Sequence, residues 1–331
     1  MPEALRVLVA DKFEASGIAG LEQLGASVTL SPDLGPDTLP DALAGVEVLV
    51  VRSTKVPSSV IESADALRVI VRAGSGYDNI DCEAAGARGI AVCNCPGMNA
   101  VAVAELAMGH LIALDRRIPE QHEALRAGRW DKKEFSKAKG LKGRSILIVG
   151  TGAIGTEMIT RCKAFGMRVY AQSRSLGHDT ARALGIEPIP YTREALHETL
   201  GKVDAVSIHV AATPDTVDLC NAAFFHAMQP GAYFINTSRG ELVDEGALAE
   251  AVRSKGIRAA VDVYRDQPGE KQCDWTTPLA TLPNVHGTHH CGASTDQAQL
   301  AVADEVVRIV KTYRDEHRCI NVVNESELAT A

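Results

Sequence analysis

The chain has 331 residues, which is enough for two domains, and 46% of them are hydrophobic. The formal net charge of −8 and the lack of a Lys/Arg-rich run argue against nucleic acid and anionic membranes as partners. No apolar run approaches the roughly 20 residues of a membrane span, and the segment from Met1 to Arg6 is too short and polar for a signal peptide. The eight cysteines follow no disulfide-framework spacing, so we expect a cytoplasmic protein.

The first part of the chain alternates apolar strands with short helices. The expected strands are Leu5–Ala10, Ser27–Leu30, Val46–Val51, Val69–Arg72 and Ile90–Cys93, with helices at Ile18–Gly25, at Pro36–Ala44 and before Val69. Arg52 and Arg72 stand at the carboxyl ends of two of these strands. Ligands of open α/β sheets bind beyond such ends, so both arginines are candidate anion ligands, with a solvated surface role as the alternative.

The next segment is a helical run from Ala100 that is apolar nearly all round, A-V-A-V-A-E-L-A-M-G-H-L-I-A-L. A helix of this kind must be buried, either between domains or in a subunit interface, and we expect a structural role for Glu105 within it. Residues 116–142 are charged and carry Trp130, which predicts a connection followed by an exposed helix.

Residues 145–174 predict one strand–turn–helix–strand unit, which organises the rest of the chain. The apolar run Ile146–Val149 is typical of a buried parallel strand, residues 156–165 of a helix, and Arg168–Gln172 of a second strand. The turn between the first strand and the helix reads G-T-G-A-I-G. This context makes the G-x-G-x-x-G spacing a specific signal for a dinucleotide site, with a ligand-free glycine turn as the alternative.

Each of these three glycines has a distinct physical role. Gly150 permits the tight turn, and Gly152 lets the backbone approach a pyrophosphate. Gly155 lets the helix pack close to the strand. The helix N-terminus offers free N–H groups and a positive dipole end to the anion.

Strand–helix alternation continues to the end of the chain. The expected strands are Val203–His209, Ala232–Asn236, Ala259–Val263 and Val285–His290, and the expected helices are Asn221–Met228, Glu245–Ser254 and Asp296–Arg314. This order predicts an α/β protein with a doubly wound parallel sheet. The irregular segment Asp266–Pro283 is an expected active-site rim, and the last helix is expected to return to the N-terminal domain.

Several motifs in order give the chain a resemblance that covers almost its whole length. They are V-R-S-T-K-V (51–56), V-R-A-G-S-G-Y-D-N-I-D (71–81), P-G-M-N-A-V-A-V-A-E-L-A (96–107), the glycine fingerprint, I-N-T-S-R-G-E-L-V-D-E-G-A-L (235–248), A-A-V-D-V (259–263) and H-H-C-G-A-S-T (289–295). With them the chain resembles the D-2-hydroxyacid dehydrogenases, and among them the phosphoglycerate dehydrogenase branch.

The resemblance implies two Rossmann-like or flavodoxin-like domains with parallel sheets and an interdomain active-site cleft. Residues 1–99 and 288–331 would form the substrate-binding and catalytic domain, and residues 100–287 the NAD(P)-binding Rossmann domain. It also implies a homodimer that packs through the nucleotide-binding domain and the helix after Pro96. Since the chain stops at Ala331, we expect the short form without the C-terminal serine-regulatory domain.

The family's catalytic set is an arginine, a glutamate and a histidine. By resemblance the arginine is Arg239, whose guanidinium fork suits carboxylate and keto oxygens. The histidine is His290, which would protonate the carbonyl oxygen in reduction, because the Cys-Gly-Ala-Ser-Thr that follows favours it over His289. Gln267 stands where the family has the glutamate.

This glutamine changes the expected acid–base chemistry. A carboxylate beside a histidine raises the pKa of the ring, whereas Gln267 can orient the ring but brings no charge. We therefore expect a lower histidine pKa than in relatives with glutamate, and a reduction optimum at lower pH. Formate dehydrogenases of the same superfamily also pair glutamine with histidine, which makes formate oxidation a minor alternative.

We expect no metal site. Cys93 and Cys95 form a C-x-C pair, but no second pair completes a zinc set, so buried cysteines at a strand end are the preferred interpretation. A zinc site at His286, His289 and His290 lacks fitting partners.

The expected cofactor is NAD or NADP, with NADP favoured. NAD enzymes place an acidic residue after the second strand of the βαβ unit, and here Ser173 and Arg174 stand there, which suits a 2′-phosphate. By resemblance, Asp262 would hold the nicotinamide carboxamide. The full set of expected cofactor contacts is Ser75, Gly150, Gly152, Ala153, Ile154, Gly155, Ser173, Arg174, Thr237, Ser238, Asp262 and Gly292.

The expected reaction is hydride transfer between NAD(P) and a D-2-hydroxy acid with a second anionic group. The first choice is 3-phosphoglycerate/3-phosphohydroxypyruvate, a pair that belongs to serine biosynthesis, with substrate contacts from Arg52, Ser53, Arg72, Ala73, Gly74 and Asn99. The alternatives are a hydroxypyruvate/glyoxylate reductase and a dehydrogenase of another anionic hydroxy acid such as sulfolactate. A non-enzymatic corepressor that senses dinucleotide is a minor alternative, because Arg239 and His290 are retained.

Overall fold

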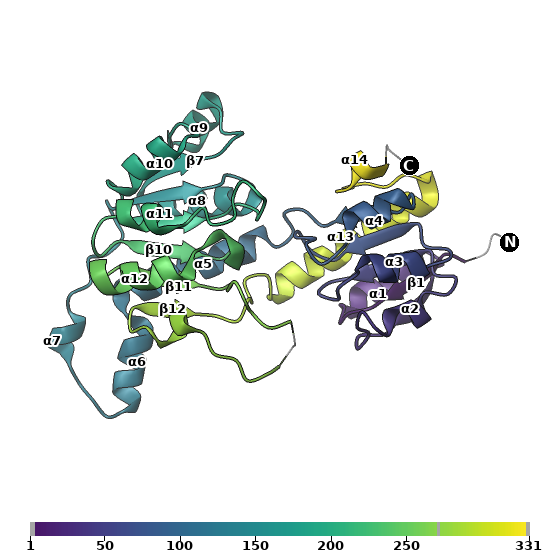
Figure 1. Cartoon of the computed structure of the whole chain (residues 1–331), viewed down its shortest axis with the longest axis horizontal. Coiled ribbons are helices and arrows are strands. Elements are labelled where there is room, and N and C mark those ends of the chain that lie inside the picture. Colours follow the sequence, from purple (N-terminus) through teal and green to yellow (C-terminus); the bar gives the residue numbers. More distant parts are fainter. Residues whose placement is uncertain (1–3, 270–271, 329–331) are drawn as a thin grey trace. The chain divides into compact units, whose positions relative to one another are not determined.

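The computed structural model describes residues 4–269 and 272–328, which form two compact units (Figure 1). The first unit comprises Met1–Asn99 and Ser294–Ala331, and the second comprises Ala100–Ala293. Each unit has its own parallel sheet with helices on both faces, so the predicted α/β class is confirmed. No helix within residues 4–269 and 272–328 is long and apolar enough to cross a membrane.

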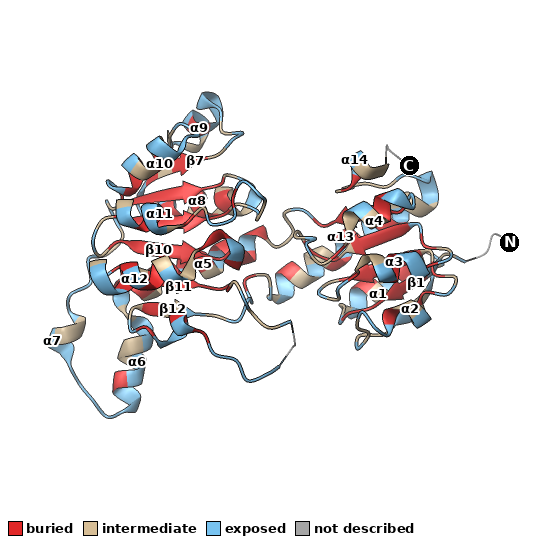
Figure 2. Ribbon diagram, viewed as in Figure 1, coloured by how far each residue is buried: buried red, intermediate tan, exposed pale blue. Residues whose placement is uncertain are grey.

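The first unit is built on a five-stranded sheet in the order β2-β1-β3-β4-β5. The strands are β1 Arg6–Val9, β2 Ser27–Leu30, β3 Val48–Val51, β4 Val69–Arg72 and β5 Ala91–Asn94, and every pairing is parallel. Alternate strand residues enter two separate cores: Leu8, Leu49 and Ile70 on one face, and their neighbours Val7 and Val48 on the other. Buried strands between two helical layers explain the near-continuous apolar runs (Figure 2).

Within the described residues of this unit there are six helices. They are α1 Ala15–Gln23, α2 Leu39–Ala42, α3 Ser58–Ser63, α4 Cys82–Ala87, α13 Asp296–Glu316 and α14 Glu325–Leu328. The long helix α13 packs on α1 at Gly17, where a Cβ would lie 2.9 Å from the Cβ of Ala303. The predicted return of the last helix to the N-terminal part is therefore a close helix–helix contact. Cys93 and Cys95 are fully buried, as expected for strand-end cysteines.

The second unit holds a seven-stranded sheet in the order β12-β11-β10-β9-β6-β7-β8. The strands are β6 Ser145–Val149, β7 Arg168–Gln172, β8 Glu187–Pro188, β9 Ala205–Ile208, β10 Tyr233–Asn236, β11 Arg258–Val261 and β12 Val285–Gly287, all paired in parallel. The strand order reverses at β6, where the glycine loop begins, which makes this end of the sheet a topological switch point.

The described part of the second unit holds the α-helices α5 Ala100–Arg116, α6 Ile118–Arg126, α7 Lys132–Phe135, α8 Ala153–Ala164, α9 His178–Leu184, α10 Arg193–Leu200, α11 Ala222–Ala227 and α12 Glu245–Lys255. Residues of α5 and α8 enter the core on one face, and residues of α10, α11 and α12 enter the core on the other. In the latter core the rings of Phe224, Phe225 and Phe234 meet edge to face, with centroids 5.1 to 6.2 Å apart.

Helix α5 has one exposed side within its own unit. It packs against α8, β10 and β11, yet Val101, Glu105 and Gly109 lie exposed along one side of it within this unit. Glu105 forms an ion pair with Arg161 of α8 at 3.3 Å. These positions recur every four residues and form one helix face, and the expectation that this face is buried between domains or in a subunit interface stays a prediction.

Several element boundaries differ by a few residues from the sequence-based expectation, and three differences matter for the site. Helix α8 begins at Ala153 and not at residue 156, because Gly152 already acts as its N-cap. Residues 175–202 form α9, β8 and α10, none of which was expected. The chain passes back to the first unit at residue 294 and not at residue 288, because residues 288–292 are hydrogen-bonded to Asp262 of the second unit. Residues 270–271 of the expected active-site rim lie outside the described residues.

Candidate active site

The glycine loop between β6 and α8 has the geometry of an anion cradle. Gly150 has φ +97°, and a Cβ there would overlap the carbonyl group of His209. A Cβ at Gly155 would overlap the carbonyl oxygen of Gly150, so this glycine lets α8 approach the turn closely. Around Gly152, by contrast, nothing lies within 4 Å of an added Cβ. The first turn of α8, with Ala153 and Ile154, therefore presents open backbone N–H groups to a ligand.

Two buried polar atoms at the carboxyl ends of β9 and β10 find no hydrogen-bond partner within residues 4–269 and 272–328. They are Oγ1 of Thr237, after β10, and Nδ1 of His209, after β9. Burial lowers the pKa of His209 to about 4, so its ring is neutral near pH 7, and its Nε2 lies 2.8 Å from Oγ of Ser207. Buried polar groups are normally satisfied, so these atoms fit a polar ligand at the carboxyl ends of the strands. Thr237 was a predicted cofactor contact, whereas His209 was missed, although it directly follows a strand.

The loop after β7 begins Ser173-Arg174-Ser175, and no acidic side chain stands among these three residues. The hydroxyl groups of Ser173 and Ser175 are 3.5 Å apart, and Arg174 is exposed beside them. Two hydroxyls and a guanidinium in one short loop can donate hydrogen bonds to a phosphate.

Arg239 lies in the loop after β10, and Gly240 lets this loop pack tightly against the loop after β11. A Cβ at Gly240 would overlap the backbone of Tyr264 and Arg265, which follow β11. The side chain of Asn236 donates to the carbonyl oxygen of Arg239 at 2.8 Å, and Ser238 donates to the carbonyl oxygen of Ile208 at 2.8 Å. Arg239 and the turn that carries Gln267 are therefore adjacent parts of one surface.

Gln267 and His290 form a direct hydrogen bond. Nε2 of Gln267 lies 2.6 Å from Nδ1 of His290, while Oε1 of Gln267 accepts the backbone N–H of Tyr264 at 3.2 Å. A backbone N–H is always a donor, so this contact fixes which end of the amide faces the histidine. The amide NH₂ therefore donates to Nδ1, and the neutral ring carries its proton on Nε2.

The same geometry opposes a second proton on His290. An imidazolium has N–H groups at both nitrogens, so its Nδ1–H would face the NH₂ of Gln267. Turning the amide over would relieve this contact, but the NH₂ would then face the N–H of Tyr264. A carboxylate could accept from both groups at once. The glutamine thus disfavours the charged ring through its donors as well as through its lack of charge.

The predicted substrate residues lie in the first unit, at the carboxyl edge of its sheet. Arg52 and Arg72 leave adjacent strands β3 and β4, and Ala73 donates to the carbonyl oxygen of Val51 at 2.7 Å. Asp11, which the sequence did not single out, holds the loop that begins with Arg52. Its Oδ2 accepts the backbone N–H groups of residues 52, 53 and 54 at 2.7 to 3.1 Å, and its Oδ1 accepts the Ser53 hydroxyl at 2.9 Å.

The second substrate loop depends on Gly74. This residue has φ +150°, and a Cβ there would overlap the guanidinium of Arg72, which folds back over the loop. Ser75 donates to Oδ1 of Asn99 at 2.9 Å, so these two predicted site residues are in direct contact. The side chain of Arg52 donates to Oε1 of Gln299 in α13 at 2.9 Å.

The three histidines near the end of the second unit do not gather around one point. Nε2 of His286 lies 3.2 Å from Oε2 of Glu120 in α6, whereas His290 pairs with Gln267. Within the described ranges, no group of three His, Cys, Asp or Glu side chains is arranged to hold a metal ion.

Comparison with known proteins places this arrangement in a family. A model of the D-isomer specific 2-hydroxyacid dehydrogenase NAD binding domain matches residues 108–292. The D-3-phosphoglycerate dehydrogenase of Methanocaldococcus jannaschii is 38% identical, over 97% of this chain and 59% of its own length. That of Mycobacterium leprae is also 38% identical, over 92% of this chain and 56% of its own. The chain thus spans somewhat over half the length of these curated relatives.

Solved structures resemble the whole chain. The TT0316 protein of Thermus thermophilus is 30% identical, with a TM-score of 0.85, over 96% of this chain and 99% of that one. An NADPH-dependent glyoxylate/hydroxypyruvate reductase of Sinorhizobium meliloti, in complex with NADP and malonate, is 27% identical, with a TM-score of 0.83 and 98% of both chains covered. Since the family model spans more than half of the chain, the protein belongs to the D-isomer specific 2-hydroxyacid dehydrogenase family.

Proposed function

We propose that the protein is an oxidoreductase that transfers a hydride between NAD(P) and a D-2-hydroxy acid with a second anionic group, with 3-phosphoglycerate/3-phosphohydroxypyruvate as the first candidate pair. The observation that carries this proposal is the pairing of His290 with Gln267 in the same unit as an open glycine loop. The relatives named D-3-phosphoglycerate dehydrogenase support the choice of substrate.

The roles of the residues follow from their chemistry. The glycine loop and the N-terminus of α8 bind the pyrophosphate, and Thr237 lies where it can donate to the same cofactor. When bound, the nicotinamide supplies or accepts the hydride. Arg239 holds the carboxylate and keto oxygens through its fork of N–H donors. In reduction, the imidazolium form of His290 gives its Nε2 proton to the keto oxygen, which leaves a neutral ring.

The glutamine gives a prediction for the pH dependence of reduction. In Gln267→Glu a carboxylate replaces the amide NH₂ that faces Nδ1, which raises the pKa of His290 by about one unit. The acid form then persists to higher pH, so the alkaline limb of the kcat/KM profile for reduction moves upward by about one pH unit. Profiles of both enzymes measured side by side test this.

Gln272→Glu is the control, because it adds the same charge at an exposed position in the loop that follows. It is expected to keep the wild-type profile. Identical profiles for the wild type and Gln267→Glu would contradict the role given to Gln267.

The second anion is assigned to Arg52 and Arg72. Both leave adjacent strand ends, and the backbone of the loop at Arg52 is held by Asp11. Charge-assisted contacts with a phosphate contribute about 1.5–3 kcal/mol. We therefore expect Arg52→Ala to raise the KM for phosphohydroxypyruvate about tenfold to a hundredfold and to leave the KM for hydroxypyruvate little changed.

The assay follows loss of reduced cofactor with both keto acids, each with NADH and with NADPH. Arg68→Ala removes an exposed arginine ahead of β4 and serves as the control. Equal or better rates with hydroxypyruvate, together with no effect of Arg52→Ala, would refute the phosphate assignment. They would favour a hydroxypyruvate/glyoxylate reductase, the activity named for the Sinorhizobium meliloti protein.

We propose NADP as the preferred cofactor because Ser173, Arg174 and Ser175 can all donate to a 2′-phosphate. Arg174→Ala is expected to raise the KM for NADPH about tenfold, and Ser173→Asp to shift the preference toward NADH. Initial rates with both cofactors measure this, with Arg182→Ala on α9 as an exposed control. If Arg174→Ala leaves the ratio of kcat/KM values for NADPH and NADH unchanged, the preference for NADP is wrong.

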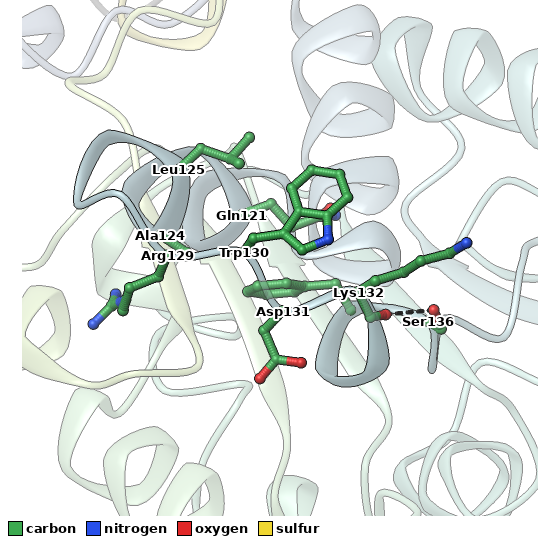
Figure 3. Close-up of a pocket in the computed structure, with 9 residues that line it drawn as sticks. Gln121, Ala124, Leu125, Arg129, Trp130, Asp131, Lys132 and Ser136 are labelled. Atoms are coloured by element: carbon green, nitrogen blue, oxygen red, sulfur yellow. Dashed lines mark hydrogen bonds between the residues drawn. The ribbon is translucent and has the colours of Figure 1, made fainter.

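We propose a homodimer that packs through the second unit, with the helix α5 after Pro96 and the α6–α7 arm, residues 117–142, at its interface. Ile118, Leu125 and Trp130 are 49%, 57% and 80% exposed there, and a pocket lies between α6, the loop after it and α7 (Figure 3). The arm carries eight Lys and Arg against four Asp and Glu, while the whole chain has a net charge of −8. A basic apolar surface on an acidic chain is complementary to a second copy.

Trp130→Glu is expected to weaken this dimer at least tenfold, because a charge replaces a large aromatic contact. Sedimentation equilibrium of the full chain measures the change. Tyr191→Glu, at a 52% exposed position outside the arm, is the matched control. A monomeric wild type, or equal dissociation constants for the wild type and Trp130→Glu, would overturn the assignment.

A further inference from the structure

The turn that carries His290 is built around one buried carboxylate. Asp262 is 1% exposed, and its Oδ1 accepts the hydroxyl of Thr288 at 2.6 Å and the backbone N–H of Cys291 at 3.0 Å. Its Oδ2 accepts the backbone N–H of Gly292 at 2.9 Å, and its carbonyl oxygen accepts the N–H of His290 at 2.7 Å. The residues on both sides of His290 are thus bonded to Asp262.

This restraint matters because His290 has an unfavourable backbone conformation. Its φ is +50°, in the left-handed region that residues with a side chain seldom adopt. Such a conformation persists only where the surroundings determine it. The hydrogen bonds to Asp262 hold the turn in this conformation. They thereby orient the His290 side chain toward Gln267.

The side chain of His110 contacts Thr288 as well. Nε2 of His110, in the middle of α5, lies 3.2 Å from Oγ1 of Thr288. The hydroxyl hydrogen of Thr288 is already donated to Asp262, so the contact with His110 requires the ring to donate its Nε2–H. His110 is 6% exposed, and burial lowers its pKa, with Asp262 and His286 as its charged or titratable neighbours. The bonds therefore run in one direction, from His110 to Thr288 to Asp262.

We propose that His110 and Thr288 are positioning residues for catalysis: their relay fixes the Asp262 carboxylate and thereby the turn that presents His290. This inference rests on the proposed role of His290 as the proton donor. A neutral hydrogen-bond chain suits the task, because it orients the carboxylate without adding a charge beside the catalytic ring. If His110 were only a satisfied core histidine, its loss would change stability but not the chemical step.

The test compares two substitutions at Thr288. Thr288→Val keeps the shape and removes the hydroxyl, whereas Thr288→Ser keeps the hydroxyl. We expect Thr288→Val to lower kcat about tenfold with little change in the KM for the keto acid, and Thr288→Ser to stay within about twofold of the wild type. Thr199→Val, which removes another buried hydroxyl bond in the same unit, is expected to lower Tm and leave kcat unchanged.

Substitution of His110 tests the relay itself. His110→Leu is expected to lower kcat, and the double variant with Thr288→Val to be no worse than Thr288→Val alone, because both remove one chain of bonds. If His110→Leu does not fold, His110→Gln is tested in its place, because its amide can still donate a hydrogen bond to Thr288. Additive losses in kcat would overturn the relay, and so would a Thr288→Ser variant as impaired as Thr288→Val.

A readout independent of turnover separates this inference from the proposed function. Hydrogen exchange of the folded chain, followed on peptides that cover residues 286–295, reports the amides bonded to Asp262. We expect faster exchange there in Thr288→Val and wild-type exchange in Thr288→Ser. Unchanged exchange in Thr288→Val would refute the positioning role. A wild type that turns over none of the keto acids would refute the proposed function. In that case hydrogen exchange alone would test the relay from His110 through Thr288 to Asp262.

Discussion

A buried aspartate within two residues of a strand's carboxyl end holds the loops of the candidate site in both units. Asp11 is 5% exposed and accepts three successive backbone N–H groups beyond β3, while Asp262 is 1% exposed and accepts those of the His290 turn. A carboxylate in such a place is costly unless donors surround it, so the loops must close around it. The arrangement of the candidate active site follows from this requirement and from parallel strands that end at one edge.

Two glycines let these loops pack closely against neighbouring backbone. At Gly240 the loop that carries Arg239 meets the turn that leads to Gln267 with no room for a side chain. At Gly150 the glycine loop meets the residue that follows β9 in the same way. Each contact joins the ends of two neighbouring strands, so side chains far apart in the sequence come to lie on one surface. A methyl group at either position would push these loops apart, because the overlap is with backbone.

The central strands could be predicted from the sequence because burial on both faces leaves apolar runs, as in β4, which has the expected bounds. The bounds of β2 and β7 were also as expected, although β2 is a largely exposed edge strand. The region of α9, β8 and α10 was missed, since β8 has two residues at the sheet edge, one of them exposed, and gives no apolar run. Motifs identified Arg239, Gln267 and His290, but they carry no information on hydrogen-bond direction. Asp11, His209 and the His110–Thr288 contact depend on pairings between distant segments, which local periodicity does not encode.

The orientation of one amide decides the acid–base character of this site. Gln267 bonds to a backbone donor at one end and to a ring nitrogen at the other, and an amide can satisfy both only while the ring lacks a proton at Nδ1. A carboxylate would satisfy both in either state of the ring and would add an attractive charge. The chain therefore holds His290 in one neutral tautomer at the expense of its proton affinity. In the reduction proposed above, the glutamine would thus orient the ring firmly but add no charge to its acid form.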